Sequence, residues 1–168
     1  MKIKPTRIEI ESLDKEDLVR LIAVGLTDSP QFGIRYDKRV YKTLPDTNSE
    51  DCIEDKCAKV LLAGGSCFVT DYDADGCDYD GADLTHTVNE DDTVEYRIDL
   101  DAIRDGLHHA ANAEFIPSCK DELETITKEQ EYVRTAFDEF ADKDSGGFDE
   151  DYASTLWQII LFNEVIYC

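Results

Sequence analysis

The chain has 168 residues, and 42% of them are hydrophobic, which predicts a folded chain with a core of its own. It carries 39 Asp and Glu residues against 17 Lys and Arg residues, a formal net charge of −22 at pH 7. Nucleic acids and anionic membranes are bound by clustered cations, so we expect neither of these partners and favour a basic protein instead.

The first third of the chain predicts one short strand, a strand-like segment and two helices. Residues 7–10 alternate as a strand does, and Ser12 looks like the N-cap of a helix whose apolar run covers 18–24. Residues 32–41 mix cations with aromatic and β-branched residues, a pattern typical of a strand or an extended arm. Residues 49–62 predict the second helix, which a pair of glycines ends.

Strand signals dominate the middle of the chain. Residues 66–70 and 93–98 both predict strands, and the second segment alternates clearly between apolar and polar residues. An acidic connector lies between them and holds a further short strand signal near 85–88.

Three helices complete the pattern. The first is capped by Asp99 or Asp101 and runs to about residue 113. The second ends at residue 141 and begins near Cys119 or Thr127, after a proline. The last, over 149–166, is apolar on most of its surface and should lie buried at the centre of the fold.

Helices around a short antiparallel sheet predict an α+β fold, with about three strands, four to five helices and a buried C-terminal helix. We expect a single domain over 1–168, in which the charge is unevenly divided. Residues 1–62 hold 11 cations and 12 carboxylates, whereas residues 63–168 hold 6 and 27. The excess of negative charge therefore belongs to the later part of the chain.

Two acidic segments resemble the opening of a calcium-binding EF-hand loop. One begins at Asp71 and the other at Asp142. Calcium in such a loop needs a bidentate carboxylate at position 12, and that position is Ala82 in the first segment and Ala153 in the second. We expect solvated acidic turns and no bound metal, with calcium binding as an alternative.

Motifs for other chemistry are lacking. The sequence has no nucleophile elbow, no phosphate-binding glycine loop and no zinc-protease motif, so we expect neither an enzyme nor a cofactor. The six cysteines include no Cys-x-x-Cys pair, which argues against a zinc knuckle. With no apolar leader at the N-terminus and no run of about 18 apolar residues, we expect reduced thiols, a cytoplasmic protein and no membrane span.

The C-terminus resembles that of a known group of proteins. Residues 148–153, Gln158 and residues 161–168 resemble the ending of small acidic proteins of unassigned activity from tailed phages, prophages and plasmids, which end in a pattern like D-x-x-T-A-D-x-x-x-Q-x-x-L-F-G-E-V-V-Y-G. Two closing glycines of that pattern are replaced here by Asn163 and Cys168. The resemblance implies a mobile-element origin and a bacterial host, and it implies no reaction.

Within that motif, the polar residues Gln158 and Glu164 stand in an apolar helix end, where a carboxylate must be exposed or hydrogen-bonded. We expect them to form a helix-end polar network. The motif positions to which we assign a structural role are Gln158, Phe162, Glu164 and Tyr167.

The favoured function is inhibition of a basic host protein, such as a nuclease or CRISPR effector, by an acidic surface that mimics DNA. The competing interpretation is that the charge only keeps the protein soluble. We expect the surface to combine fifteen carboxylates: Asp71, Asp73, Asp75, Asp78, Asp80, Asp83, Glu90, Asp91, Asp92, Asp138, Glu139, Asp142, Asp144, Asp149 and Asp151.

An alternative function is the binding of a small anionic ligand, for example a nucleotide signal, to counter host defence. Such a ligand needs a local group of cations. The sequence offers one dense group, which consists of Arg35, Lys38, Arg39 and Lys42.

Overall fold

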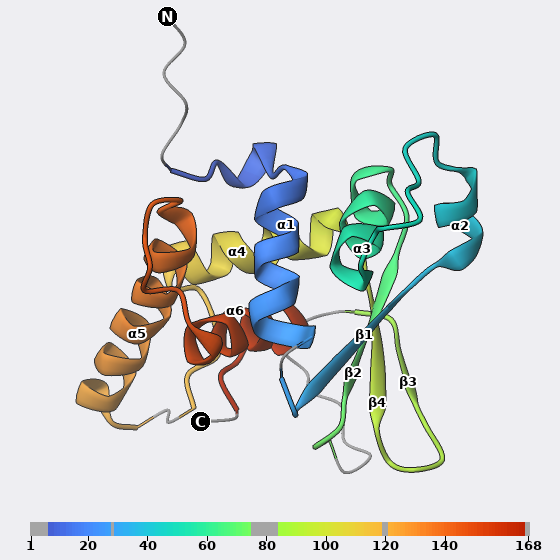
Figure 1. Ribbon diagram of the computed structural model, residues 1–168. Coiled ribbons are helices and arrows are strands. Elements are labelled where there is room, and N and C mark those ends of the chain that lie inside the picture. Colours follow the sequence, from blue (N-terminus) through green and yellow to red (C-terminus); the bar gives the residue numbers. More distant parts are fainter. Residues whose placement is uncertain (1–6, 28, 75–83, 119–120, 167–168) are drawn as a thin grey trace, which may run out of the picture.

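The computed structural model describes residues 7–27, 29–74, 84–118 and 121–166 (Figure 1). Its α+β class confirms the prediction from the sequence. The described residues form a four-stranded sheet and six α-helices, so one strand and one short helix exceed the expected numbers. No helix in these ranges is both long and apolar enough to cross a membrane.

The sheet is antiparallel throughout, in the order β1-β2-β4-β3. Its strands are β1 (Phe32–Tyr36), β2 (Cys67–Asp71), β3 (His86–Val88) and β4 (Val94–Ile98). In β2 and β4 alternate residues are buried, as the alternation in the sequence predicts, and these residues form the inner face of the sheet. The residues between them form the outer face, on which Arg35, Phe68 and Arg97 occupy one row of the register.

Four helices lie on one side of the sheet in Figure 1. They are α1 (Lys15–Ile22), α4 (Leu100–Asn112), α5 (Leu123–Ala141) and α6 (Glu150–Phe162). The helix α6 packs on α4 and α5 and on the π-helical turn η2 (Ala23–Thr27) that extends α1. The remaining helices, α2 (Lys38–Thr43) and α3 (Ile53–Leu62), lie near one end of the sheet.

The predicted burial of the last helix is confirmed. Every residue from Thr155 to Phe162 is buried in α6. The ring of Phe162 lies 6.3 Å from that of Phe32 in β1 and 5.6 Å from that of Tyr96 in β4. The helix α6 thus joins the helical side of the core to the inner face of the sheet.

Glycine at position 106 lets α4 and α6 approach closely. A Cβ atom added to Gly106 would lie 2.5 Å from Cγ1 of Ile160 and 2.6 Å from its Cα. The contact therefore brings the backbones of two helices together without an intervening side chain.

The predicted strand over 7–10 is wrong. Arg7 forms an isolated bridge with Asp142, and the N–H of Ile8 donates to the carbonyl of Ala141 at 2.7 Å. The segment pairs with the end of α5, and the chain then enters the 3-10 turn η1 (Ile10–Ser12). Alternation alone does not show whether a neighbouring strand exists.

Helix caps follow the acidic residues of the sequence in most places. Asp99 caps α4 and Asp149 caps α6, both by accepting a backbone N–H three residues on. The predicted cap at Ser12 is wrong, because Asp14 is the N-cap of α1. The side chains of Asp14 and Asp17 accept each other's backbone N–H, which completes a capping box that Ser12 lacks.

Candidate ligand-binding pocket

The predicted acidic surface is divided in the structure. Asp75, Asp78, Asp80 and Asp83 lie outside the described residues. Asp71 is a wrong prediction, since its exposed fraction is 0%. The alternation of β2 places it on the inner face beside Val69, and its Oδ1 accepts the N–H of Asp73 at 3.0 Å.

The other carboxylates fall into separate groups. Asp73 is exposed just after β2, and residues 90–92 form the turn between β3 and β4. The remaining six lie at the end of α5 and around the start of α6, at the opposite end of the molecule from the β3–β4 turn (Figure 1): Asp138, Glu139, Asp142, Asp144, Asp149 and Asp151. The described carboxylates of the predicted surface therefore do not form one continuous face.

Several of these carboxylates hold the local structure. Asp91 accepts the N–H and the hydroxyl of Thr93, which lowers the pKa of Asp91. Asp138 pairs with Arg7, and Glu139 accepts the hydroxyl of Ser145. The contact of Asp91 with the backbone of Thr93 is the kind that acidic residues make in turns, whereas Asp138 and Glu139 belong to α5.

The second calcium-like loop has alanine at its last position, and the structure places this residue, Ala153, fully buried in α6. Most of the first loop lies outside the described residues. Among the described residues, no group of His, Cys, Asp or Glu is arranged to hold a metal ion.

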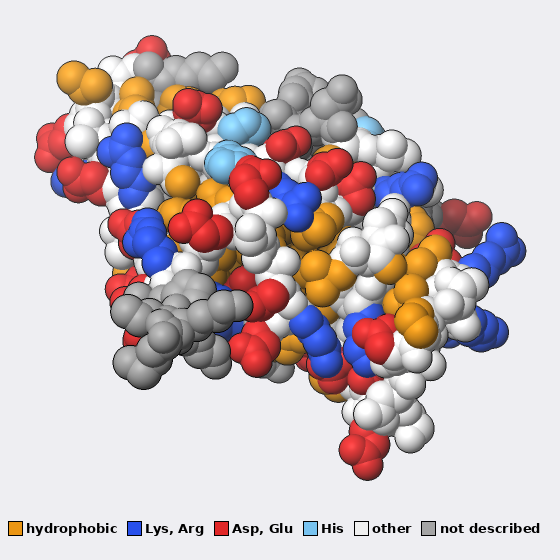
Figure 2. Space-filling view, turned by 90° about the horizontal axis from the view of Figure 1, so that it is seen from above, with side chains coloured by type: hydrophobic (Ala, Val, Ile, Leu, Met, Phe, Trp, Pro, Cys, Tyr) orange, Lys and Arg blue, Asp and Glu red, His pale blue; other side chains and the backbone are white. Residues whose placement is uncertain are grey.

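Cations gather near α2 and α3, at the end of the sheet away from the β3–β4 turn (Figure 1). Figure 2 shows Lys and Arg side chains along the edge that carries α2 and α3 in Figure 1. A hollow of ≈ 770 Å³ opens there. It is lined by four cations, one carboxylate, two aromatic rings and one aliphatic side chain: Arg35, Tyr36, Asp37, Lys38, Arg39, Ile53, Lys56 and Phe68.

Asp37 lies between β1 and α2 at the edge of this pocket and is the N-cap of α2. Its Oδ1 accepts the N–H of Arg39 at 2.9 Å and that of Val40 at 3.3 Å, as an N-cap does. Of the two predictions for residues 32–41, a strand or an extended arm, the strand is correct over Phe32–Tyr36, and a short helix follows it. The carboxylate of Asp37 is directed to the backbone, while Lys38 and Arg39 are exposed on the first turn of α2.

On the outer face of the sheet, Arg35 is held in a fixed orientation. Its guanidinium carbon lies 4.0 Å from the centre of the Phe68 ring. Its Nε and Nη2 donate to the two carboxylate oxygens of Glu95 at 2.9 and 2.7 Å. These hydrogen bonds raise the pKa of Arg35.

Lys56 supplies the cation on the α3 side of the pocket. Its Nζ lies 5.6 Å from the centre of the Tyr36 ring and 5.7 Å from that of Tyr41, within reach of a cation–π contact. Among the described residues, no carboxylate forms an ion pair with Lys38, Arg39 or Lys56. The positive charge of these three side chains is free to act on a ligand.

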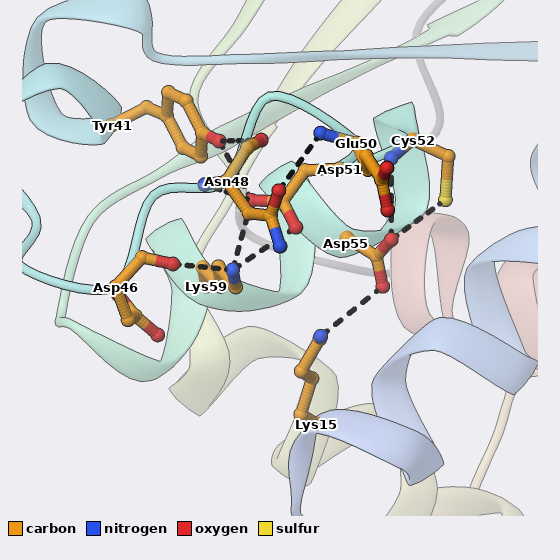
Figure 3. Close-up of polar contacts among 9 residues, drawn as sticks. All are labelled: Lys15, Tyr41, Asp46, Asn48, Glu50, Asp51, Cys52, Asp55 and Lys59. Atoms are coloured by element: carbon orange, nitrogen blue, oxygen red, sulfur yellow. Dashed lines mark hydrogen bonds and ion pairs between the residues drawn. The ribbon is translucent and has the colours of Figure 1, made fainter.

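A buried polar network fixes the wall behind the pocket (Figure 3). Lys59 donates to both carboxylate oxygens of Asp51, at 3.1 and 2.8 Å, and to the carbonyl of Asp46 at 2.6 Å. Tyr41 donates to Asp51 at 2.7 Å. The hydrogen bonds from Lys59 and Tyr41 hold the pKa of Asp51 at about 2.

The same network ties α2 to α3 and α3 to α1. Because Tyr41 belongs to α2 and Lys59 to α3, their shared partner Asp51 sets the distance between these helices. Asp55 accepts the Cys52 thiol at 3.0 Å and pairs with Lys15 of α1 at 3.3 Å (Figure 3). Contacts in the network thus hold Tyr41 in place below Lys56.

Three of the four cations that the sequence grouped together line the pocket, and Lys42 does not. Reasoning from the sequence missed Lys56, which is distant in the chain, and Phe68. The outward position of Phe68 could have been predicted from the sequence. In a strand, Phe68 lies between Cys67 and Val69, whose side chains point inward, so its own side chain points outward.

Residues of the C-terminal motif hold the end of the chain. Gln158 is buried, and its Oε1 accepts the N–H of Ile166 at 2.7 Å. Phe162 is buried in the core, and Glu164 is half-buried and forms a backbone bridge with Ile116. Tyr167 lies outside the described residues.

Three cysteines are described, and all three are free thiols. Cys52 is exposed, whereas Cys57 and Cys67 are buried. Contact with the Cys57 thiol, together with burial, raises the pKa of Cys67.

Comparison of the chain with protein-family models, with curated proteins and with solved structures finds no match in any of the three.

Proposed function

We propose that the protein binds an anionic small molecule in the pocket between β1, α2, α3 and β2, and that it acts without catalysis. The observation that carries this proposal is the charge of the lining. A chain of net charge −22 places four cations and one carboxylate around one hollow, and the carboxylate is the N-cap of α2.

A ligand in the pocket responds to the charges near it rather than to the net charge of the chain. Interactions between exposed charges fall off beyond about 10 Å at 0.1 M salt, so a ligand in the pocket responds mainly to Lys38, Arg39 and Lys56. Phosphate and carboxylate groups are the anions that such side chains bind by charge-assisted hydrogen bonds. The volume of ≈ 770 Å³ lies within the range of about 300–1,000 Å³ that is typical of small-molecule sites.

The proposal is tested by titrating the protein with inorganic pyrophosphate in a calorimeter. A double variant with Lys38→Gln and Arg39→Gln should bind at least tenfold more weakly, since one hydrogen bond to a charged group contributes about 1.5–3 kcal/mol. The matched control is Lys42→Gln, which removes one charge from α2 outside the pocket lining. A loss of binding free energy in the control about half as large as that in the double variant, in proportion to the charges removed, would show that only the total charge matters.

A second candidate function is the inhibition of a basic host nuclease or CRISPR effector in the bacterial cytoplasm by a protein of mobile-element origin. It is favoured by the segment that covers the α5–α6 turn and the first residues of α6, where Asp144, Glu150 and Asp151 are exposed and form no ion pair with a described cation. A triple variant that carries the corresponding amides should lose protection of DNA against such a nuclease. Protection that is unchanged would refute this function for the segment.

A further inference from the structure

The strongest unexplained feature of the pocket is the arrangement of Arg35. Two of its guanidinium nitrogens donate hydrogen bonds to Glu95, and its guanidinium carbon lies 4.0 Å from the centre of the Phe68 ring. Its side chain is nevertheless 59% exposed, against 20% for that of Glu95. One flat face of the guanidinium is therefore covered by the ring, while much of the side chain is open to the solvent.

Because of this arrangement, Arg35 is suited to stacking on a planar group, and the binding of phosphate is left to the other cations of the pocket. An arginine binds phosphate best when its fork of N–H donors is free to meet two oxygens. In Arg35 that fork is already engaged by a carboxylate, and its charge is balanced. What the side chain still offers is a supported planar surface, and planar guanidinium groups stack on aromatic rings.

We infer that the ligand of the pocket is a nucleoside phosphate, whose base stacks on Arg35 and whose phosphates contact Lys38, Arg39 and Lys56. This inference rests on the proposed function and adds the chemical class of the ligand. The Phe68 ring supports the guanidinium from below and Glu95 fixes its plane. The three unpaired cations supply the positive charge for the phosphates.

The volume of the pocket is large enough for both a base and its phosphates. Inorganic phosphate or pyrophosphate would use only the cationic part of a hollow of ≈ 770 Å³, and the rings of Tyr36 and Phe68 would contribute nothing to its binding. A nucleoside phosphate uses both parts, the phosphates at the cations and the base at Arg35. Stacking of a base on an aromatic or guanidinium surface corresponds to about a 5- to 150-fold gain in affinity.

The test compares the dissociation constants of four probes by calorimetry: inorganic pyrophosphate, ribose 5-phosphate, ADP and GDP. We expect ADP or GDP to bind about 5- to 150-fold more tightly than pyrophosphate. We expect Arg35→Lys, which keeps the charge and removes the plane, to abolish that gain and to weaken pyrophosphate binding far less than nucleotide binding. Phe68→Leu should reduce the gain in the same direction, and Lys42→Gln should leave it intact.

The outcomes separate this inference from the proposed function. If pyrophosphate binds through Lys38 and Arg39 but neither nucleotide binds more tightly, the nucleotide inference is overturned and the anion site stands. If Arg35→Lys weakens pyrophosphate and nucleotide equally, Arg35 contacts phosphate and the stacking role is overturned. If no probe binds, the proposed function fails and the inference fails with it. Because Arg35 is exposed on the sheet surface, its lysine variant tests the inference even if Phe68→Leu does not fold.

Discussion

Replacing Gly106 by alanine tests how closely α4 and α6 approach. The added methyl group would lie 2.5 Å from Cγ1 of Ile160 and 2.6 Å from its Cα, whereas ordinary contacts of this kind begin at 3.4 Å. The two helices must separate by several tenths of an ångström or more, because the Cα atom belongs to the backbone of a buried helix and cannot rotate away.

The expected loss of stability follows from two opposing contributions. Overpacking of a core costs about 1–3 kcal/mol, and the backbone contact argues for the upper half of that range. Alanine gains about 1 kcal/mol over glycine inside a helix. The net loss is therefore about 1–2 kcal/mol, which lowers the Tm of a protein of this size by roughly 2–8 °C.

Thermal unfolding followed by far-UV circular dichroism measures this shift, with urea unfolding as a second measurement. The matched control is Gly146→Ala, since no atom lies within 4 Å of a Cβ at Gly146. Its Tm should change little. A Gly106→Ala variant as stable as the native protein, or more stable, would refute the close approach of α4 and α6.

Two further predictions concern pH and calcium. The pKa of Asp51 is about 2 in the folded protein against an ordinary value of 3.8, so its ionised form stabilises the fold above about pH 4 and this contribution is lost as the pH falls towards 2. In urea unfolding, the stability difference between the native protein and Asp51→Asn should therefore shrink between pH 5 and pH 2, and a constant difference would contradict the assigned hydrogen bonds. Millimolar calcium should leave the Tm unchanged beyond the effect of equal ionic strength, because Ala153 supplies no ligand; a specific rise of several degrees would contradict this.

Periodicity in the sequence was sufficient to locate the strands and helices that have one buried face. The strands over 67–71, 86–88 and 94–98 lie within a residue or two of their predicted positions, as does the helix that Asp99 caps. The last helix was predicted over 149–166 and ends at Phe162, because Asn163 adopts a left-handed conformation with φ 51°. Such an end is typically formed by glycine, and asparagine gives a weaker signal.

The arrangement of charges could not be predicted in the same way. Asp71 opens an acidic segment in the sequence, but strand alternation places it on the inner face, next to Val69. Conversely, Lys56 and Phe68 complete a pocket with Arg35 only because the β1–β2 register and the α3 packing bring them together. The positions of charged residues along the chain do not show which way each side chain points or which distant segments come into contact.

Packing of the last helix on the end of α1 and on its η2 turn has a consequence for synthesis. The indole N–H of Trp157 donates to the carbonyl of Leu21 at 2.9 Å, across 136 residues of sequence, and Leu18, Leu21 and Ile22 are fully buried. While the chain grows on the ribosome, α3 can cover part of α1 early, but the η2 turn that extends α1 has no helix to pack on until residues 150–162 have emerged. Chains whose contacts are distant in sequence fold slowly and expose apolar surface in the meantime. High net charge opposes association by mutual repulsion, and the negative charge of residues 63–168 is present in the unfolded chain as well as in the folded one.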